Sequence, residues 1–234
     1  MVKIRKSNER GHTNLGWLDS YHTFSFGDYY DADYIGFHKL RVINEDRIKG
    51  GTGFGSHPHR DMEIITYIQE GSLEHKDSIA NGSVIKKGDM QRMSAGTGVV
   101  HSEYNHSESE PVHLLQIWIL PKEKGIKPSY EERSIDPNGI KGNLSLVATG
   151  TRSKKNEALY LNQDVDIYLS SLEMGQEVKH IAEADHHLWV QAIRGSLILN
   201  GKNLEQGDGA SIQNEGEIII STNDSAEFLL FDME

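Results

Sequence analysis

Short apolar runs separated by glycine-containing turns are the sequence feature that most restricts the fold. Such runs occur along the whole chain, for example at 37–43, 62–68, 112–120, 188–193, 217–221 and 227–232. Each has the length of a strand, and the periodicity of an amphipathic helix is scarce. The breaks combine glycine with polar residues, as in GGTGFG, KKGD, SAGTG and EQGD, which is typical of turns. The sequence therefore predicts an all-β protein.

The turn pattern recurs in the two halves of the chain. EGSL at 70–73 is similar to RGSL at 194–197, and KKGD at 86–89 is similar to EQGD at 205–208. The polar segment ATGTRSKKNEA at 148–158 lies between the two copies. Internal similarity of this kind indicates duplicated modules. We therefore predict two tandem β domains, residues 1–138 and 139–234.

Composition excludes several kinds of site and partner. The 234 residues include no cysteine, which excludes disulfides, thiolate metal ligands and cysteine nucleophiles. The net charge is −11, whereas nucleic acids and anionic membranes bind surfaces rich in Lys and Arg. No apolar run approaches the roughly 20 residues of a membrane span, and the charged start MVKIRKSNERG does not read as a secretion signal. We expect a cytoplasmic protein that binds neither nucleic acid nor membranes directly.

Two histidine-containing segments have the spacing of a metal site. His57 and His59 are separated by one residue, and so are His101 and Glu103. On an extended backbone, such side chains project from the same face, roughly 6–7 Å apart along the chain. Two pairs on neighbouring strands would supply three neutral imidazoles and one carboxylate, which suit first-row divalent metals and leave room for water, substrate or dioxygen. His75 is equally compatible with orienting a ligand and with an ordinary strand position.

The same segments resemble known motifs. The Gly-His-His-Glu spacing at 51–63, followed by a glycine at 71, resembles the first cupin motif, and the Gly-His-Asn spacing at 98–105 resembles the second. More narrowly, HPHRDMEIITYIQEGSLEHKDS, GDMQRMSAGTGVVHSEYN and the opening segment GWLDSYHTFSFGDYYD resemble the pirin family of bicupins. The resemblance is strongest over residues 10–120 and continues more weakly to the end. It implies two tandem jelly-roll β-barrel domains with a single metal in the N-terminal one.

The resemblance implies that the metal ligands are His57, His59, His101 and Glu103. Cupins often use the carboxylate of the first motif, here Glu63, as the fourth ligand, and the spacing alone does not eliminate it. On a continuous strand Glu63 would lie roughly 13 Å from His59, so we favour Glu103. The resemblance favours iron(II), and other first-row divalent metals also suit this ligand set. The second half has no matching His-x-His pair, so we expect a degenerate C-terminal domain without a metal site.

The resemblance also implies an activity. Bacterial pirins of this type resemble quercetin 2,3-dioxygenases, which open the heterocycle of a flavonol with dioxygen and release carbon monoxide. The metal would lower the pKa of the flavonol 3-hydroxyl, and Glu103 would take its proton as the catalytic base. The expected partners are therefore a flavonol, or another small aromatic enol, and dioxygen.

Two other functions stay open at this point. The metal could be a redox sensor in a regulatory protein that acts through a protein partner, as animal pirins are thought to do with transcription factors. Another cupin reaction, such as sugar isomerisation or a different ring cleavage, is the second alternative. A closed pocket around a coordinatively saturated metal, without turnover, would favour the regulatory function.

Overall fold

The protein, described over residues 1–234 by a computed structural model, consists of strands, turns and three short 3-10 helices. The 3-10 helices are η1 (Ser7–Glu9), η2 (Ala32–Tyr34) and η3 (Arg152–Lys154). The prediction of an all-β protein is confirmed. None of the helices is long and apolar enough to cross a membrane.

The chain divides into two compact units. The N-terminal unit contains Gly11–Ile135 and Leu159–Gln163, and the C-terminal unit contains Met1–Arg10, Asp136–Ala158 and Asp164–Glu234. The predicted boundary after residue 138 is close to the division after Ile135, but the units are not continuous segments. The first residues belong to the C-terminal unit because β1 (Val2–Arg5) pairs with β20 (Gly209–Gln213). Residues 159–163 belong to the N-terminal unit, where they bond to Glu63 and Glu131.

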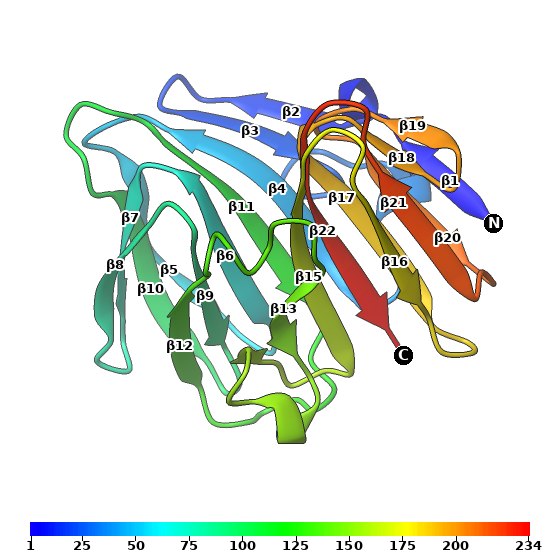
Figure 1. Cartoon of the computed structure of the whole chain (residues 1–234). Coiled ribbons are helices and arrows are strands. Elements are labelled where there is room, and N and C mark those ends of the chain that lie inside the picture. Colours follow the sequence, from blue (N-terminus) through cyan, green and yellow to red (C-terminus); the bar gives the residue numbers. More distant parts are fainter. The chain divides into compact units, whose positions relative to one another are not determined.

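The N-terminal unit contains two antiparallel sheets. A seven-stranded sheet has the order β12-β9-β6-β11-β4-β3-β2, and a four-stranded sheet has the order β5-β10-β7-β8 (Figure 1). Their strands are β2 (Gly11–Asn14), β3 (Leu18–His22), β4 (Leu40–Ile48), β5 (Gly53–His59), β6 (Glu63–Glu70), β7 (Ser72–Asp77), β8 (Gly82–Lys86), β9 (Asp89–Ser94), β10 (Val99–Asn105), β11 (Val112–Ile119) and β12 (Ser129–Ser134). The short strand β14 (Leu159–Tyr160) also lies in this unit.

The C-terminal unit repeats this arrangement. Its larger sheet contains β1-β20-β17-β22-β15-β13 and its smaller sheet has the order β16-β21-β18-β19. The strands not yet defined are β13 (Ser145–Thr149), β15 (Val165–Leu172), β16 (Glu177–Ile181), β17 (His187–Gly195), β18 (Leu197–Leu199), β19 (Lys202–Leu204), β21 (Glu217–Ser221) and β22 (Ala226–Met233). When β4 to β11 are matched in order with β15 to β22, neighbouring strands are the same in both units.

The repeated glycine turns have a common structural cause. Gly71 follows β6 with φ +77°, and Gly195 ends β17 with φ +66°, a region that L-residues with a side chain rarely adopt. A Cβ at Gly71 would lie 2.8 Å from the Pro111 carbonyl oxygen, and one at Gly195 would lie 1.9 Å from that of Ser225. Both glycines therefore allow a tight turn and a close backbone approach at the same place in the two units. The predicted duplication is confirmed.

The interiors of the two units differ in polarity. In the C-terminal unit, one apolar cluster extends over β15 to β22 and includes Leu188, Val190 and Phe228. In the N-terminal unit, Ile64 and Ile68 of β6 belong to two separate apolar clusters. Thr66 lies between them on the same face of β6, because side chains alternate along a strand. A polar layer therefore interrupts the N-terminal core.

Candidate metal centre

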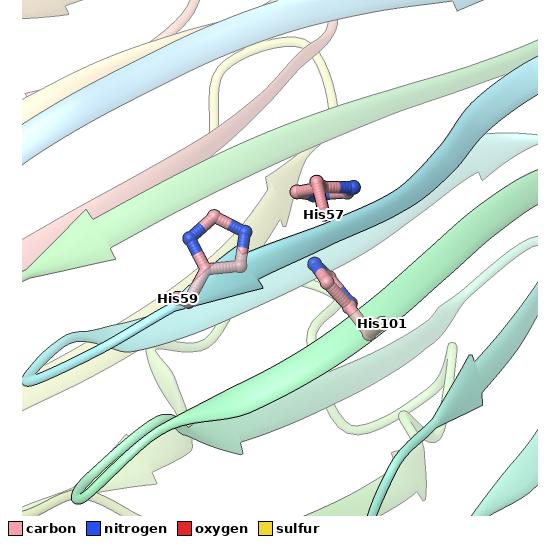
Figure 2. A group of neighbouring side chains, drawn as sticks. All are labelled: His57, His59 and His101. Atoms are coloured by element: carbon pink, nitrogen blue, oxygen red, sulfur yellow. The ribbon is translucent and has the colours of Figure 1, made fainter.

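Three of the predicted site residues lie together at the pairing of β5 with β10. His101 is registered opposite His57, and Val99 opposite His59. The ring centroids are 4.8 Å apart for His57 and His59, 4.4 Å for His57 and His101, and 4.9 Å for His59 and His101. Figure 2 shows the two imidazoles of β5 beside the imidazole of β10. Strand alternation and this register bring the three rings together.

The nitrogen atoms of two of these rings fit a metal ion. His57 donates a hydrogen bond from Nδ1 to the carbonyl oxygen of Gly55 over 2.7 Å, so its Nε2 carries the lone pair. Nε2 of His101 is buried and has no hydrogen-bond partner. A buried polar atom without a partner is costly, and a bound cation would satisfy it.

The protonation states also suit a cation. Burial, reinforced by His57, lowers the pKa of His59 to about 4. Burial, reinforced by His57 and His59, lowers the pKa of His101 to about 3. Both rings are therefore neutral near pH 7, and no proton has to leave them when a metal binds. The donor set fits a first-row divalent metal, since neutral imidazole is a common ligand of such ions.

Glu103 lies beside this cluster and is held by three side chains. Its Oε2 accepts a hydrogen bond from Nε2 of Gln116 at 2.8 Å. Its Oε1 accepts bonds from Nε2 of Gln91 at 3.2 Å and from Oγ1 of Thr66 at 3.5 Å. Glu103 offers an oxygen within 4.8 Å of ligand atoms of His101 and His75. Burial raises the pKa of Glu103, although these hydrogen bonds and the nearby histidines oppose the effect.

Glu63, the alternative fourth ligand, is engaged elsewhere. Its Oε2 accepts a hydrogen bond from Oγ of Ser94 at 2.9 Å and another from the backbone N–H of Asn162 at 3.2 Å. Because Glu63 and Thr66 are three residues apart on one strand, their side chains lie on opposite faces of β6. Thr66 contacts Glu103. Glu63 thus anchors the 159–163 segment on the other side of the sheet.

His75 and Asp77 form a hydrogen-bonded chain behind His101. Nδ1 of His101 lies 3.5 Å from Nδ1 of His75, and Nε2 of His75 donates to Oδ2 of Asp77 at 3.2 Å. Asp77 is fixed in turn by Nδ2 of Asn81 at 2.9 Å. The ring of His75 stacks on Tyr130 with the centroids 4.7 Å apart. This chain places the proton of His101 on Nδ1 and leaves its Nε2 available.

A row of five polar side chains, four of them buried and one half-buried, crosses the inner face of the seven-stranded sheet. Register pairs each member with the next on the neighbouring strand, in the order Gln91, Thr66, Gln116, Asn44 and His22. The three members on β9, β6 and β11 are those that bond to Glu103. The sequence analysis missed this row, although a signal exists. Thr66 and Gln116 are polar residues inside the otherwise largely apolar runs of β6 and β11.

An open cavity of about 350 Å³ adjoins the centre. Its walls include His57, His59 and Glu103 together with Trp118, whose ring lies 5.0 Å from that of His59. A volume of this size and a largely apolar wall with a few polar groups are typical of small-molecule sites. Further apolar side chains in the wall are Leu15, Leu18, Phe26 and Phe54.

The histidines of the C-terminal unit have a different arrangement. Nε2 of His180 donates to Oδ2 of Asp232 at 2.7 Å, and Nδ1 of His186 donates to Oδ1 of the same carboxylate at 2.6 Å. Both nitrogens that face Asp232 are therefore occupied by hydrogen bonds.

Residues 3–119 match the Pirin family, and residues 146–233 match the family described as the quercetinase C-terminal cupin domain. The quercetin 2,3-dioxygenase of Escherichia coli K12 is 46% identical over 233 residues, which cover 100% of this chain and 99% of that protein. The crystal structure of YhhW from Escherichia coli is 45% identical, with a TM-score of 0.96, and the comparison covers 100% of this chain and 98% of that chain.

The structure of the bacterial pirin YhhW in complex with nickel(II) is 45% identical, with a TM-score of 0.94 and coverage of 100% of this chain and 99% of that one. A quercetin 2,3-dioxygenase from Acinetobacter baumannii, 22% identical, shares the fold with a TM-score of 0.79, over 99% of this chain and 85% of that chain. Three findings indicate the same family: the two family matches, the identity over the full chain, and the equal strand order of the two units. The chain therefore belongs to the pirin family and has its bicupin fold.

Proposed function

We propose that this protein is a metal-dependent dioxygenase that opens the heterocycle of a flavonol, of the quercetin 2,3-dioxygenase type. The observation that carries the proposal is the group of three imidazoles, two of them kept neutral by burial, at the wall of an open apolar cavity. The full-length relative named quercetin 2,3-dioxygenase supports it. The open cavity supports an enzyme over a regulatory protein, for which we expected a closed pocket.

The metal ligands in this proposal are His57, His59, His101 and Glu103. Iron(II) is the proposed metal, and the nickel(II) complex of YhhW is compatible with other divalent ions in such a site. When bound, the metal would supply a Lewis acid that lowers the pKa of the flavonol 3-hydroxyl.

The protein side chains have two roles in this scheme. Glu103 takes the proton of the 3-hydroxyl as catalytic base, and Gln116, Gln91 and Thr66 hold its carboxylate in place. The apolar wall, with Trp118 beside His59, binds the flat rings and excludes water from the flavonolate while dioxygen reacts.

The second domain, residues 139–234, is proposed to be a degenerate cupin without a metal site. The second half has no His-x-His pair, and its histidines His180 and His186 both bond to the single carboxylate of Asp232, which supports this. We also propose a cytoplasmic protein whose partners are small molecules rather than nucleic acid or membrane, in keeping with its net charge of −11.

A metal-by-metal assay tests the proposal. The protein is stripped with a chelator, reloaded anaerobically with iron(II), manganese, cobalt, nickel, copper or zinc, and mixed with quercetin in air. We expect dioxygen-dependent loss of quercetin with at least one redox-active metal and none with the stripped protein. Tight metal binding without turnover for any metal would favour the regulatory function instead.

A further inference from the structure

We propose that Ser20, His22, Asn44 and Asp46 form a subsite that binds hydroxyl groups on the distal rings of the substrate, and so selects polyhydroxylated aromatic compounds. The inference deepens the proposed function and rests on it for the identity of the substrate. It concerns the β3 and β4 side of the cavity, which none of the predicted metal ligands occupies.

The pairing of two strands creates the subsite. Ser20 is registered opposite Asp46, and His22 opposite Asn44. Because side chains alternate along a strand, all four project from the same face, and all four line the cavity. Each is at most 4% exposed. Buried polar side chains almost always have hydrogen-bond partners, and those on a cavity wall can orient a bound ligand.

The hydrogen bonds within the group leave capacity for a ligand. Oγ of Ser20 donates to Oδ1 of Asp46, and Nδ1 of His22 donates to Oδ1 of Asn44 at 2.9 Å. Oγ1 of Thr13 bonds to Nε2 of His22 at 3.0 Å. The second oxygen of Asp46 and the amide group of Asn44 are not used by these bonds. The subsite thus offers one acceptor for a hydroxyl proton and one donor for a hydroxyl or carbonyl oxygen.

The position of the subsite fits a molecule that also reaches the metal centre. Gln116, which bonds to Glu103, is registered opposite Asn44, and Asn44 opposite His22. Two strand spacings therefore separate the strand of Gln116 from that of His22, roughly 10 Å. A fused aromatic ring system with a further ring spans such a distance, and the apolar side chains Leu18, Phe26 and Trp118 also line the cavity.

Two flavonols separate the subsite from the metal centre experimentally. 3-Hydroxyflavone and quercetin share the 3-hydroxyl and 4-carbonyl groups, but only quercetin carries additional hydroxyls on its rings. Binding is measured by calorimetry to protein loaded with zinc, which is redox-inert and permits binding without turnover. Since one net hydrogen bond contributes a factor of about 2 to 12, we expect quercetin to bind about tenfold more tightly than 3-hydroxyflavone.

Two variants and a control decide the proposal. In the double variant Ser20→Ala with Asp46→Leu, the preference for quercetin should fall to below about twofold, while the Kd of 3-hydroxyflavone stays within about twofold of wild type. Asp46→Asn, which keeps the shape of the side chain, should reduce the preference about threefold if the double variant does not fold. Glu45→Gln is the matched control, because Glu45 lies on the other face of β4 and bonds to His113.

The outcomes distinguish the subsite from the proposed function. A preference that persists in both cavity variants, or falls equally in Glu45→Gln, would overturn the subsite and leave the flavonol activity standing. Absence of binding of both flavonols to the wild-type protein would contradict the proposed substrate class and the subsite together.

Discussion

Gln116 donates a hydrogen bond from Nε2 to Oε2 of Glu103 over 2.8 Å, and it lies between Leu114 and Trp118 on one face of β11. The bond orients the single carboxylate beside the three imidazoles. Groups that orient metal ligands commonly change metal affinity 10- to 100-fold when they are removed. We therefore expect Gln116 to affect metal affinity through the orientation of Glu103.

Replacing Gln116 by Leu should weaken divalent metal binding roughly tenfold, because Glu103 then loses its shortest hydrogen bond. Competition with a chelator measures the affinity. Gln191→Leu is the control, since Gln191 is a buried strand glutamine that bonds to the Gly207 and Asp208 carbonyls in the C-terminal unit, away from Glu103. It should lower stability without changing metal affinity. Equal loss of affinity in both variants would contradict the role of Gln116.

The choice between the two candidate carboxylates is tested by Glu103→Gln and Glu63→Gln. Metal analysis should show affinity lowered at least about tenfold in Glu103→Gln and retained in Glu63→Gln. The second variant should instead reduce the free energy of unfolding by about 1 to 2 kcal/mol, because Ser94 and Asn162 lose a charged acceptor. Metal loss confined to Glu63→Gln would overturn the assignment.

The hydrogen bonds that link Asp77, His75 and His101 predict that His75 affects metal affinity without being a ligand. His75→Phe keeps the stacking on Tyr130 but removes the nitrogen that faces Nδ1 of His101. The imidazole of His101 then loses its fixed orientation, and metal affinity should fall about tenfold. His113→Phe, which removes a buried histidine bonded to Glu45, serves as control and should leave the affinity unchanged. Unchanged affinity in His75→Phe would contradict the orienting role.

Asp46 predicts a pH dependence of stability in the metal-free protein. Burial raises its pKa from 3.8 to about 7, with Glu103 and Glu45 adding to the effect and Ser20 opposing it. Because this pKa is higher in the folded than in the unfolded state, Asp46 stabilises the fold fully below about pH 4. That contribution, at most roughly 4 kcal/mol, is lost as the pH rises to about 7.

Asp46→Asn should therefore gain stability relative to wild type between about pH 4 and 7, and the difference should stay constant above about pH 8. Urea denaturation across this range measures it. Parallel pH profiles for the two proteins would show that Asp46 does not titrate in this way.

Much of this protein could be predicted from local sequence patterns. Alternation and glycine turns indicate the strands, the EGSL and RGSL segments indicate the duplication, and the i, i+2 spacing of His57 and His59 predicts that their rings share a face. His101 lies beside these two rings because β10 pairs with β5. Local patterns do not indicate this pairing, and only the resemblance to cupins implied it.

The row of polar side chains and the pairing of the first strand with the C-terminal unit could not be predicted from local patterns. Gln91, Thr66, Gln116, Asn44 and His22 come from five strands, and only the strand order and register bring them into line. Likewise, nothing local in residues 2–5 indicates that β1 pairs with β20, more than two hundred residues along the chain. Long-range pairing decides both features.

The most direct test of the proposed function is the stoichiometry of a single reaction. Iron(II)-loaded protein is mixed with quercetin under ¹⁸O₂, and dioxygen uptake, carbon monoxide release and the label in the ring-opened product are measured together. The account predicts one dioxygen consumed and one carbon monoxide released per quercetin, both labelled atoms in the product, and loss of this reaction in Glu103→Gln. Quercetin loss without carbon monoxide, or equal rates with and without metal, would contradict it.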